Sequence, residues 1–147
     1  MTESSLTDLA SCACFNLRRA ARQLSQVFDA TLRPSGVSGG QFSLLAVLRA
    51  AKGRSVRLSD LASRLGLDRT TLTRNLHLAE REGWVSVERS DQDRRERLVT
   101  LTEAGAAAFE RALPYWREAQ AQAVRQLGAG GLEQLLDLTG RLRSDPA

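Results

Sequence analysis

The stretch from Leu58 to Thr102 decides the fold: LSDLASRLGLDRTTLTRNLHLAEREGWVSVERSDQDRRERLVTLT. Its first part predicts a short helix with Ser59 as the N-cap, because leucine and alanine recur there at helical spacing. Gly66 ends this helix, since glycine adopts positive φ without steric cost. Asp68 then caps a second helix that runs to about Glu82 and buries a leucine stripe. A separation of about three residues between two helices is typical of a helix-turn-helix.

A β-hairpin with a charged loop follows the second helix. Trp84–Arg89 alternates apolar and polar residues like a half-buried strand, and Leu98–Leu101 supplies an antiparallel partner. The segment 90–97 between them is too polar to pack, and Val56–Leu58 offers a third short strand. We expect the acidic residues of the loop to orient its arginines by ion pairing; these are Asp91, Asp93 and Glu96. The fold class expected is mainly α with a small antiparallel β-wing, a winged helix-turn-helix.

Two groups of residues in this stretch suit contact with DNA. The outer face of the second helix carries hydroxyl and guanidinium groups, which can bind base edges and phosphates in a major groove. The arginines at the loop tip can enter a narrow minor groove, where the negative potential is enhanced. A merely solvated helix face is the alternative. The expected DNA-binding residues are Arg69, Thr70, Thr71, Thr73, Arg74, Arg94 and Arg95. Thr71 can instead turn toward the first helix, and His77 either contacts a phosphate or is solvated.

Five segments together resemble the MarR-type transcriptional regulators. They are residues 58–62, 67–74, 83–85, 91–95 and the Leu-Thr-x-x-Gly that begins at Leu101. The resemblance extends over nearly the whole chain. It implies an obligate homodimer that binds a pseudo-palindromic operator on double-stranded DNA. It also implies a repressor that is released by a small phenolic or other aromatic ligand, or by oxidation.

Long amphipathic segments flank the winged stretch. An apolar stripe runs along residues 6–32, Pro34–Gly36 breaks it, and Ser38 and Gln41 form a capping box for the next helix. Thr102 caps a long helix that Pro114 should interrupt and kink. Glycines at 128–131 end it, and a last helix follows over 132–142.

These flanking segments carry more apolar stripe than the winged part can cover. Folding against a second copy buries that stripe and spaces two recognition helices about one DNA turn apart. We therefore expect one domain over 1–147. About 38–102 would form the DNA-binding lobe, and about 6–34 and 103–143 the helical dimerisation region.

Composition fits an ordinary soluble domain of 147 residues with 42% hydrophobic content. No apolar run reaches membrane-spanning length and no signal peptide is recognisable, so we expect a cytoplasmic protein without a membrane partner. The net charge is +4, and the bases concentrate in residues 52–97, with eleven Lys and Arg against eight Asp and Glu. This balance favours a polyanionic partner.

Two cysteines, Cys12 and Cys14, raise a second hypothesis, a thiol-based regulator of the same fold. If both lie on one helix they point about 200° apart, which precludes a disulfide without unwinding. Cys14 would then most often be an inert buried hydrophobe. By resemblance, however, Cys14 sits like the reactive cysteine of the organic-hydroperoxide-sensing branch. Arg18 and Phe28 stand where that branch has tyrosines, and Arg18, one helical turn away, would favour a thiolate.

A ligand pocket for a small aromatic compound would lie where the first, second and fifth helices meet the winged lobe. The residues expected there are Phe15, Arg22, Phe42 and Trp116, although aromatic residues at such positions more often belong to the core. No nucleophile elbow, phosphate loop or metal-ligand cluster is present in the sequence, so we expect no enzyme, no cofactor and no metal. The remaining functional class is a protein-interaction module that does not bind DNA. Salt dependence distinguishes the two, because DNA affinity falls steeply from low to physiological salt as counterions are released.

Overall fold

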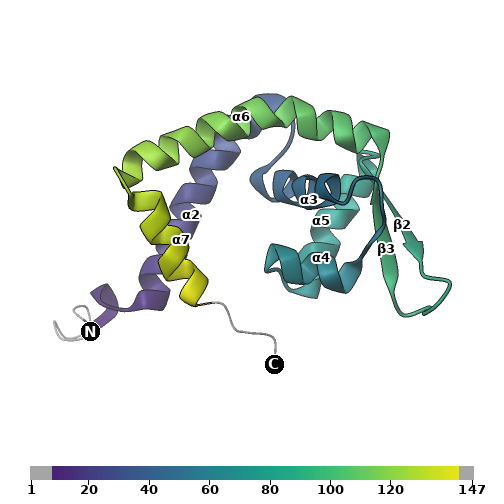
Figure 1. The fold of residues 1–147 in the computed structure, drawn as a ribbon, viewed down its shortest axis with the longest axis horizontal. Coiled ribbons are helices and arrows are strands. Elements are labelled where there is room, and N and C mark those ends of the chain that lie inside the picture. The colour runs from purple at the N-terminus through teal and green to yellow at the C-terminus, as the bar shows by residue number, and fades with distance from the viewer. Residues whose placement is uncertain (1–7, 143–147) are drawn as a thin grey trace.

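The chain folds into a mostly helical arch, seen in the computed structural model, which describes residues 8–142 (Figure 1). The elements are α2 (Ala13–Leu32), η1 (Arg33–Ser35), α3 (Gly39–Ala50), β1 (Val56–Arg57), α4 (Leu58–Leu65), α5 (Arg69–Arg81), β2 (Val85–Arg89), β3 (Arg97–Leu101), α6 (Glu103–Leu127) and α7 (Gly131–Arg141). One pillar of the arch is a lobe that holds α3, α4, α5 and the sheet. The other is an arm made of α2 and α7, and α6 spans the two. The mainly α fold with a small β-wing is confirmed.

The sheet has three antiparallel strands in the order β1-β3-β2. Val99 in the central strand pairs with Val56 on one side and Val87 on the other. The predicted third strand is real but shorter than expected, because Leu58 already begins α4. Figure 1 shows the β2–β3 hairpin projecting at the outer edge of the lobe.

The core lies inside the lobe. Its fully buried side chains come from the end of α2, from the loop before α3, from α3, α4, α5 and β3, and from α6, which adds alanines; the largest are Leu32, Val37, Leu44, Leu45, Leu48, Leu61, Leu72 and Val99. The predicted capping box of α3 is present, with Gln41 N–H donating to Ser38 Oγ at 3.2 Å and Ser38 N–H donating to Gln41 Oε1 at 3.0 Å. Asp29 of α2 accepts a further bond from Gly39 N–H at 2.7 Å, which ties arm to lobe.

The first helix departs from the prediction of one segment over residues 6–32. Residues 8–10 are helical, a bend follows at 11–12, and α2 begins only at Ala13. The side chain of Asn16 stabilises this bend by donating to the carbonyls of Ala10 and Cys12, both at 2.8 Å. A local side-chain bond of this kind competes with helical pairing and leaves no glycine or proline signature in the sequence. The part of the prediction before residue 8 lies outside the described residues.

The long helix α6 begins as predicted, with Thr102 Oγ1 accepting from Gly105 N–H at 3.0 Å. The same hydroxyl donates to the Gly83 carbonyl at 2.6 Å, so the cap is anchored to the end of α5. The predicted interruption at Pro114 is wrong, because α6 runs unbroken from Glu103 to Leu127. Helices tolerate a proline where neighbouring packing offsets the lost bond, and Figure 1 shows α6 as a single arching helix.

Candidate nucleic-acid interface

Helix α5 is held in the lobe by its apolar face. Leu72, Leu76 and Ala79 are buried there, so the opposite face is turned outward. Asp68 caps the helix as predicted, accepting from Thr71 N–H at 2.6 Å. That bond, helped by the Thr71 side chain and the charge of Arg74, holds the pKa of Asp68 below its ordinary value.

The structure places most of the expected major-groove residues on the outward face. Exposed side chains near the start of α5 are Arg69, Thr70, Thr73 and Arg74. Thr71 is half-buried and its N–H is used by the Asp68 cap, as suits a residue that turns toward the motif. His77, one turn beyond Arg74, is exposed as well.

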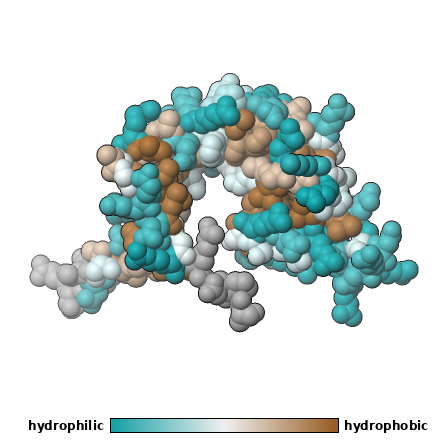
Figure 2. Space-filling model, in the orientation of Figure 1, coloured by the Kyte–Doolittle hydropathy of each residue, from teal (hydrophilic) through white to brown (hydrophobic). Residues whose placement is uncertain are grey.

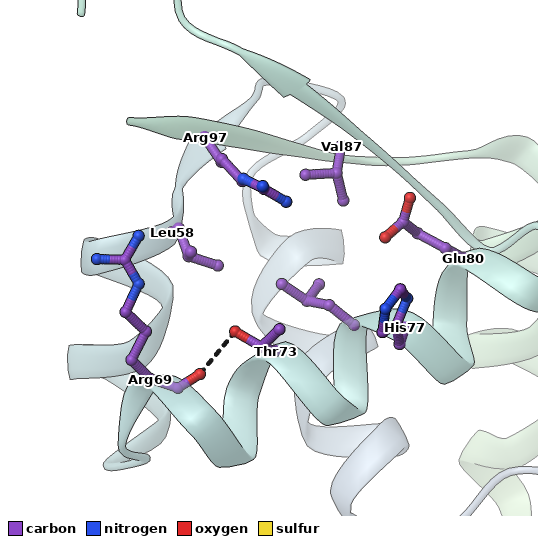
Figure 3. A pocket seen from close by; sticks show the side chains of 8 residues that line it. Leu58, Arg69, Thr73, His77, Glu80, Val87 and Arg97 are labelled. Atoms are coloured by element: carbon purple, nitrogen blue, oxygen red, sulfur yellow. Dashed lines mark hydrogen bonds between the residues drawn. The ribbon is translucent and has the colours of Figure 1, made fainter. Parts of the chain in front are cut away.

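The Thr73 hydroxyl is bonded within α5, which limits the DNA groups that it could bind. Its hydroxyl donates to the Arg69 carbonyl one turn back at 2.7 Å (Figure 3). With the hydrogen engaged, Thr73 can still accept from an exocyclic amine of adenine or cytosine, and its methyl can meet a thymine methyl. A threonine held in this way offers an acceptor and a methyl group at this position.

A hollow of about 200 Å³ lies between α5 and the sheet (Figure 3). Its floor is apolar, from Leu58, Leu76 and Val87. In Figure 3 the Arg69 side chain rises from the first turn of α5 toward the strands, and Arg97 points into the hollow from β3. His77 and Glu80 lie together at its other end.

Arg97 is a residue that the sequence reasoning did not select. It is exposed and pairs directly across the ladder with Arg89. Like charges directly opposite on a sheet are destabilising. A phosphate close to both would offset that repulsion, so the strand ends that flank the wing loop are basic as well as the loop itself. Strand alternation alone could have indicated this pair, because the register aligns positions 89 and 97.

The wing tip is a compact turn held by its own backbone. Ser90 N–H donates to the Glu96 carbonyl, and Glu96 N–H donates to the Asp93 carbonyl, both at 3.0 Å. Arg95 N–H donates to Asp93 Oδ1 at 3.0 Å. This turn leaves Arg94 and Arg95 exposed at the end of the hairpin.

The expected ion pairing within the wing is wrong. Within residues 8–142 the ion pairs are Arg49 with Glu110 and Arg141 with Asp137, and neither lies in the wing. Asp93 accepts from backbone, and Glu96 accepts from Ser59 N–H and Oγ–H at 3.4 and 3.3 Å. The predicted capping of α4 by Ser59 is also wrong, because the N-cap lies two residues earlier, at Arg57, and makes no side-chain cap bond.

Recognition helix and wing converge on a second hollow of about 300 Å³. Arg69 from α5 and Arg95 from the wing tip both line it, together with the first turn of α4. Two arginines from elements far apart in the sequence thus line one hollow. The paired forks suit phosphate oxygens, which accept two parallel hydrogen bonds from each guanidinium.

Known proteins resemble this chain in sequence and in fold. The sequence profile of the MarR family matches residues 35–96. The crystal structure of the M. tuberculosis transcriptional regulator MosR in complex with DNA is 42% identical, with a TM-score of 0.79 over 90% of this chain and 93% of that chain. The chain belongs to the MarR family.

Two curated MarR-type relatives extend the comparison. The transcriptional repressor MprA of Escherichia coli is 31% identical over 77% of this chain and 64% of its own length. The organic hydroperoxide resistance transcriptional regulator of Bacillus subtilis is 30% identical over 68% of this chain and 67% of its own length. The chain thus spans a little under two thirds of the length of MprA.

The two cysteines are placed differently from the helical expectation. Cys12 is the N-cap of α2, with an extended backbone at ψ 116°, whereas Cys14 lies in the first turn. Both are free thiols, Cys12 half-buried and Cys14 exposed in the single chain. The prediction that both lie on one helix is therefore wrong, and in the single chain Cys14 is exposed where a buried residue was expected.

The residues expected around a ligand pocket divide between lobe and arm. Phe42 is buried, and its ring stacks on Phe109 at 5.1 Å and on Trp116 at 5.5 Å between centroids. Phe15 is half-buried and Arg22 exposed, both on α2. Phe42 and Trp116 are brought together as the prediction required, whereas a ligand in contact with all four residues remains a prediction.

Neither a metal-binding cluster nor a membrane-spanning helix is found along residues 8–142. This part of the chain holds no cluster of three or more His, Cys, Asp or Glu side chains arranged to bind a metal. Within the same residues, no helix is long and apolar enough to cross a membrane.

Proposed function

We propose that this member of the MarR family is a sequence-specific DNA-binding transcriptional regulator that acts as a homodimer. The observation that carries the proposal is the convergence of Arg69 from α5 with Arg95 from the wing on one hollow. The exposed face of α5 would enter the major groove, and Arg94 and Arg95 the minor groove. The DNA complex of MosR supports this assignment by its likeness to the chain.

The division of the chain follows from the arch. Residues of about 38–102 would bind DNA, and about 6–34 and 103–143 would dimerise. Large apolar side chains remain uncovered on the arm and on the adjoining end of α6: Leu9, Leu17, Val124, Leu127, Leu136, Leu138 and Leu142. Figure 2 shows hydrophobic residues gathered along this pillar. Contiguous apolar surface of this kind marks a protein interface, and a second copy supplies a matching one.

By analogy with the MprA repressor we infer repression, relieved when a small aromatic ligand binds near Phe15, Arg22, Phe42 and Trp116. A regulator of this kind would act in the cytoplasm and would need neither cofactor nor catalytic activity. These assignments rest on family likeness and on the aromatic stack that joins α3 to α6.

The test is a titration of the protein with the intergenic DNA beside its own gene, and with random DNA of equal length. Specific binding should be tighter than random binding, and both should weaken steeply between low and physiological salt as counterions are released. Equal affinity for the two DNAs would argue against a sequence-specific regulator. Absence of DNA binding at low salt would favour a protein-interaction module.

A thiol-based sensor is the second candidate, favoured by the exposed Cys14 beside the bend at Cys12 and by the Bacillus subtilis hydroperoxide relative. An organic hydroperoxide would oxidise a Cys14 thiolate to a sulfenic acid and be reduced to the alcohol. The same titration after peroxide treatment, repeated with Cys14→Ser, tests it. Release of DNA that Cys14→Ser abolishes supports the sensor, and unchanged binding points to small-molecule ligands.

A further inference from the structure

Glu96 connects the wing to the first helix of the helix-turn-helix. Its Oε1 accepts from Ser59 N–H at 3.4 Å and from Ser59 Oγ–H at 3.3 Å. Helix α4 has no side-chain cap from its own N-cap residue, Arg57. Glu96 therefore supplies, from 37 residues further along the chain, an acceptor that a helix N-terminus usually finds locally.

The backbone of Glu96 also closes the wing tip. Its N–H and carbonyl bond to Asp93 and Ser90, so the side chain fastens the whole turn to α4 rather than one residue of it. Arg95 is the residue directly before Glu96, and it lines the same hollow as Ser59, Glu96 and Arg69. Residues 91–95 of the tip are exposed. The bonds accepted by the Ser90 and Asp93 side chains stay within the loop.

We infer that Glu96 is a positioning residue that holds the wing tip against α4 and so keeps Arg95 beside Arg69. The inference rests on the proposed DNA binding. An exposed arginine on an unfastened hairpin loses conformational entropy when it binds, whereas a fastened one has lost part of it already. Glu96 thus increases affinity through Arg95, without touching DNA.

The opposing hypothesis is that Glu96 only places a negative charge on a basic surface and repels DNA. Glu96→Gln and Glu96→Ala both remove that charge, but only Gln keeps an Oε1 acceptor for Ser59. The difference between these two variants therefore reports the hydrogen bonds alone. Glu88→Ala is the matched control, since Glu88 is an exposed carboxylate on β2 without a bond to Ser59.

The DNA titration should separate the variants. Glu96→Gln and Glu88→Ala should bind the specific DNA at least as tightly as the natural protein, and Glu96→Ala about fivefold more weakly than Glu96→Gln. In an Arg95→Ala background the difference between Ala and Gln at position 96 should vanish. Equal binding by the two Glu96 variants, or a difference that persists without Arg95, would overturn the inference.

Amide hydrogen exchange without DNA gives an independent readout. Exchange at Ser59 and across residues 90–96 should be faster in Glu96→Ala than in Glu96→Gln, while the α3 and α6 amides are unchanged. If the protein binds no DNA, this measurement still decides whether the wing is fastened, so failure of the function and failure of the inference are told apart. Unchanged exchange at those amides would refute the fastening.

Discussion

At the scale of the residue, Gly105 is required by a close backbone approach. A Cβ at this position would lie 2.1 Å from the Trp84 carbonyl oxygen and 2.6 Å from Leu101 Cδ1. The Trp84 carbonyl is held in this position because it accepts a hydrogen bond from Thr102 N–H at 3.0 Å. Gly105→Ala should lower the free energy of unfolding by about 1–3 kcal/mol.

Chemical denaturation of the variant measures this loss. The control is Gly140→Ala on α7, where no atom lies within 4 Å of the added Cβ and stability should hold or rise. Unchanged stability of Gly105→Ala would show that α6 can shift away from the Trp84 carbonyl.

A pH dependence is expected at Asp68. Its folded-state pKa lies below the ordinary 3.8, chiefly through the bond from Thr71 N–H, so its stabilisation is complete above 3.8 and is lost as pH falls through the lower folded value. Asn at position 68 keeps the cap but has no charge to titrate. The melting temperature of the natural protein should therefore exceed that of Asp68→Asn near neutral pH, and the gap should close in acid below 3.8.

Thermal melts of the two proteins across the acid range measure this convergence. Asp68→Ala is the control, because it lacks the cap at every pH. A gap that stays constant into acid would mean that the Asp68 charge contributes nothing.

At the scale of the element, the proposed DNA contacts of α5 and of the wing should have different effects on binding. Arg94→Ala should weaken binding to specific and random DNA alike, since a wing arginine responds to groove potential and phosphate. Thr73→Ala and Arg74→Ala should also change sequence preference, with a loss of about 1–3 kcal/mol confined to the cognate DNA. Competition binding with single-base variants of the operator resolves the two patterns. Equal losses of affinity for specific and random DNA in all three variants would contradict these separate roles for α5 and the wing.

The elements differ in how far local sequence determines them. The caps at Ser38, Asp68 and Thr102 were predictable because donor and acceptor lie within three residues of each other. The start of α4 was not, since its acceptor arrives from Glu96 in the wing. Likewise the bend before α2 depends on where one asparagine side chain bonds, which periodicity does not report.

At the scale of the whole molecule, the arch depends on contacts that no single segment encodes. Arg111 Nε of α6 donates to the Ser35 carbonyl at 3.0 Å, and Arg49 of α3 pairs with Glu110 at 3.5 Å. These bonds join α6 to η1 and to α3 across long stretches of sequence. The sequence therefore predicted which segments are amphipathic and where exposed arginines and threonines gather on α5 and the wing, but not how the arm is set relative to the lobe.

The apolar arm gives the last prediction. Leu138 and Leu142 lie one helical turn apart at the end of α7, with 57% and 66% of their surface exposed. If a second copy covers them, Leu138→Glu with Leu142→Glu should place charges in an apolar interface and shift the protein from dimer to monomer. Leu78→Glu is the matched control, because Leu78 is 42% exposed but lies on α5, in the lobe. Sedimentation measures the mass of each, and the separated monomer should bind a two-half-site operator far more weakly because it loses the linked second contact. A double variant that sediments like the natural protein would place the dimer interface elsewhere on the arch.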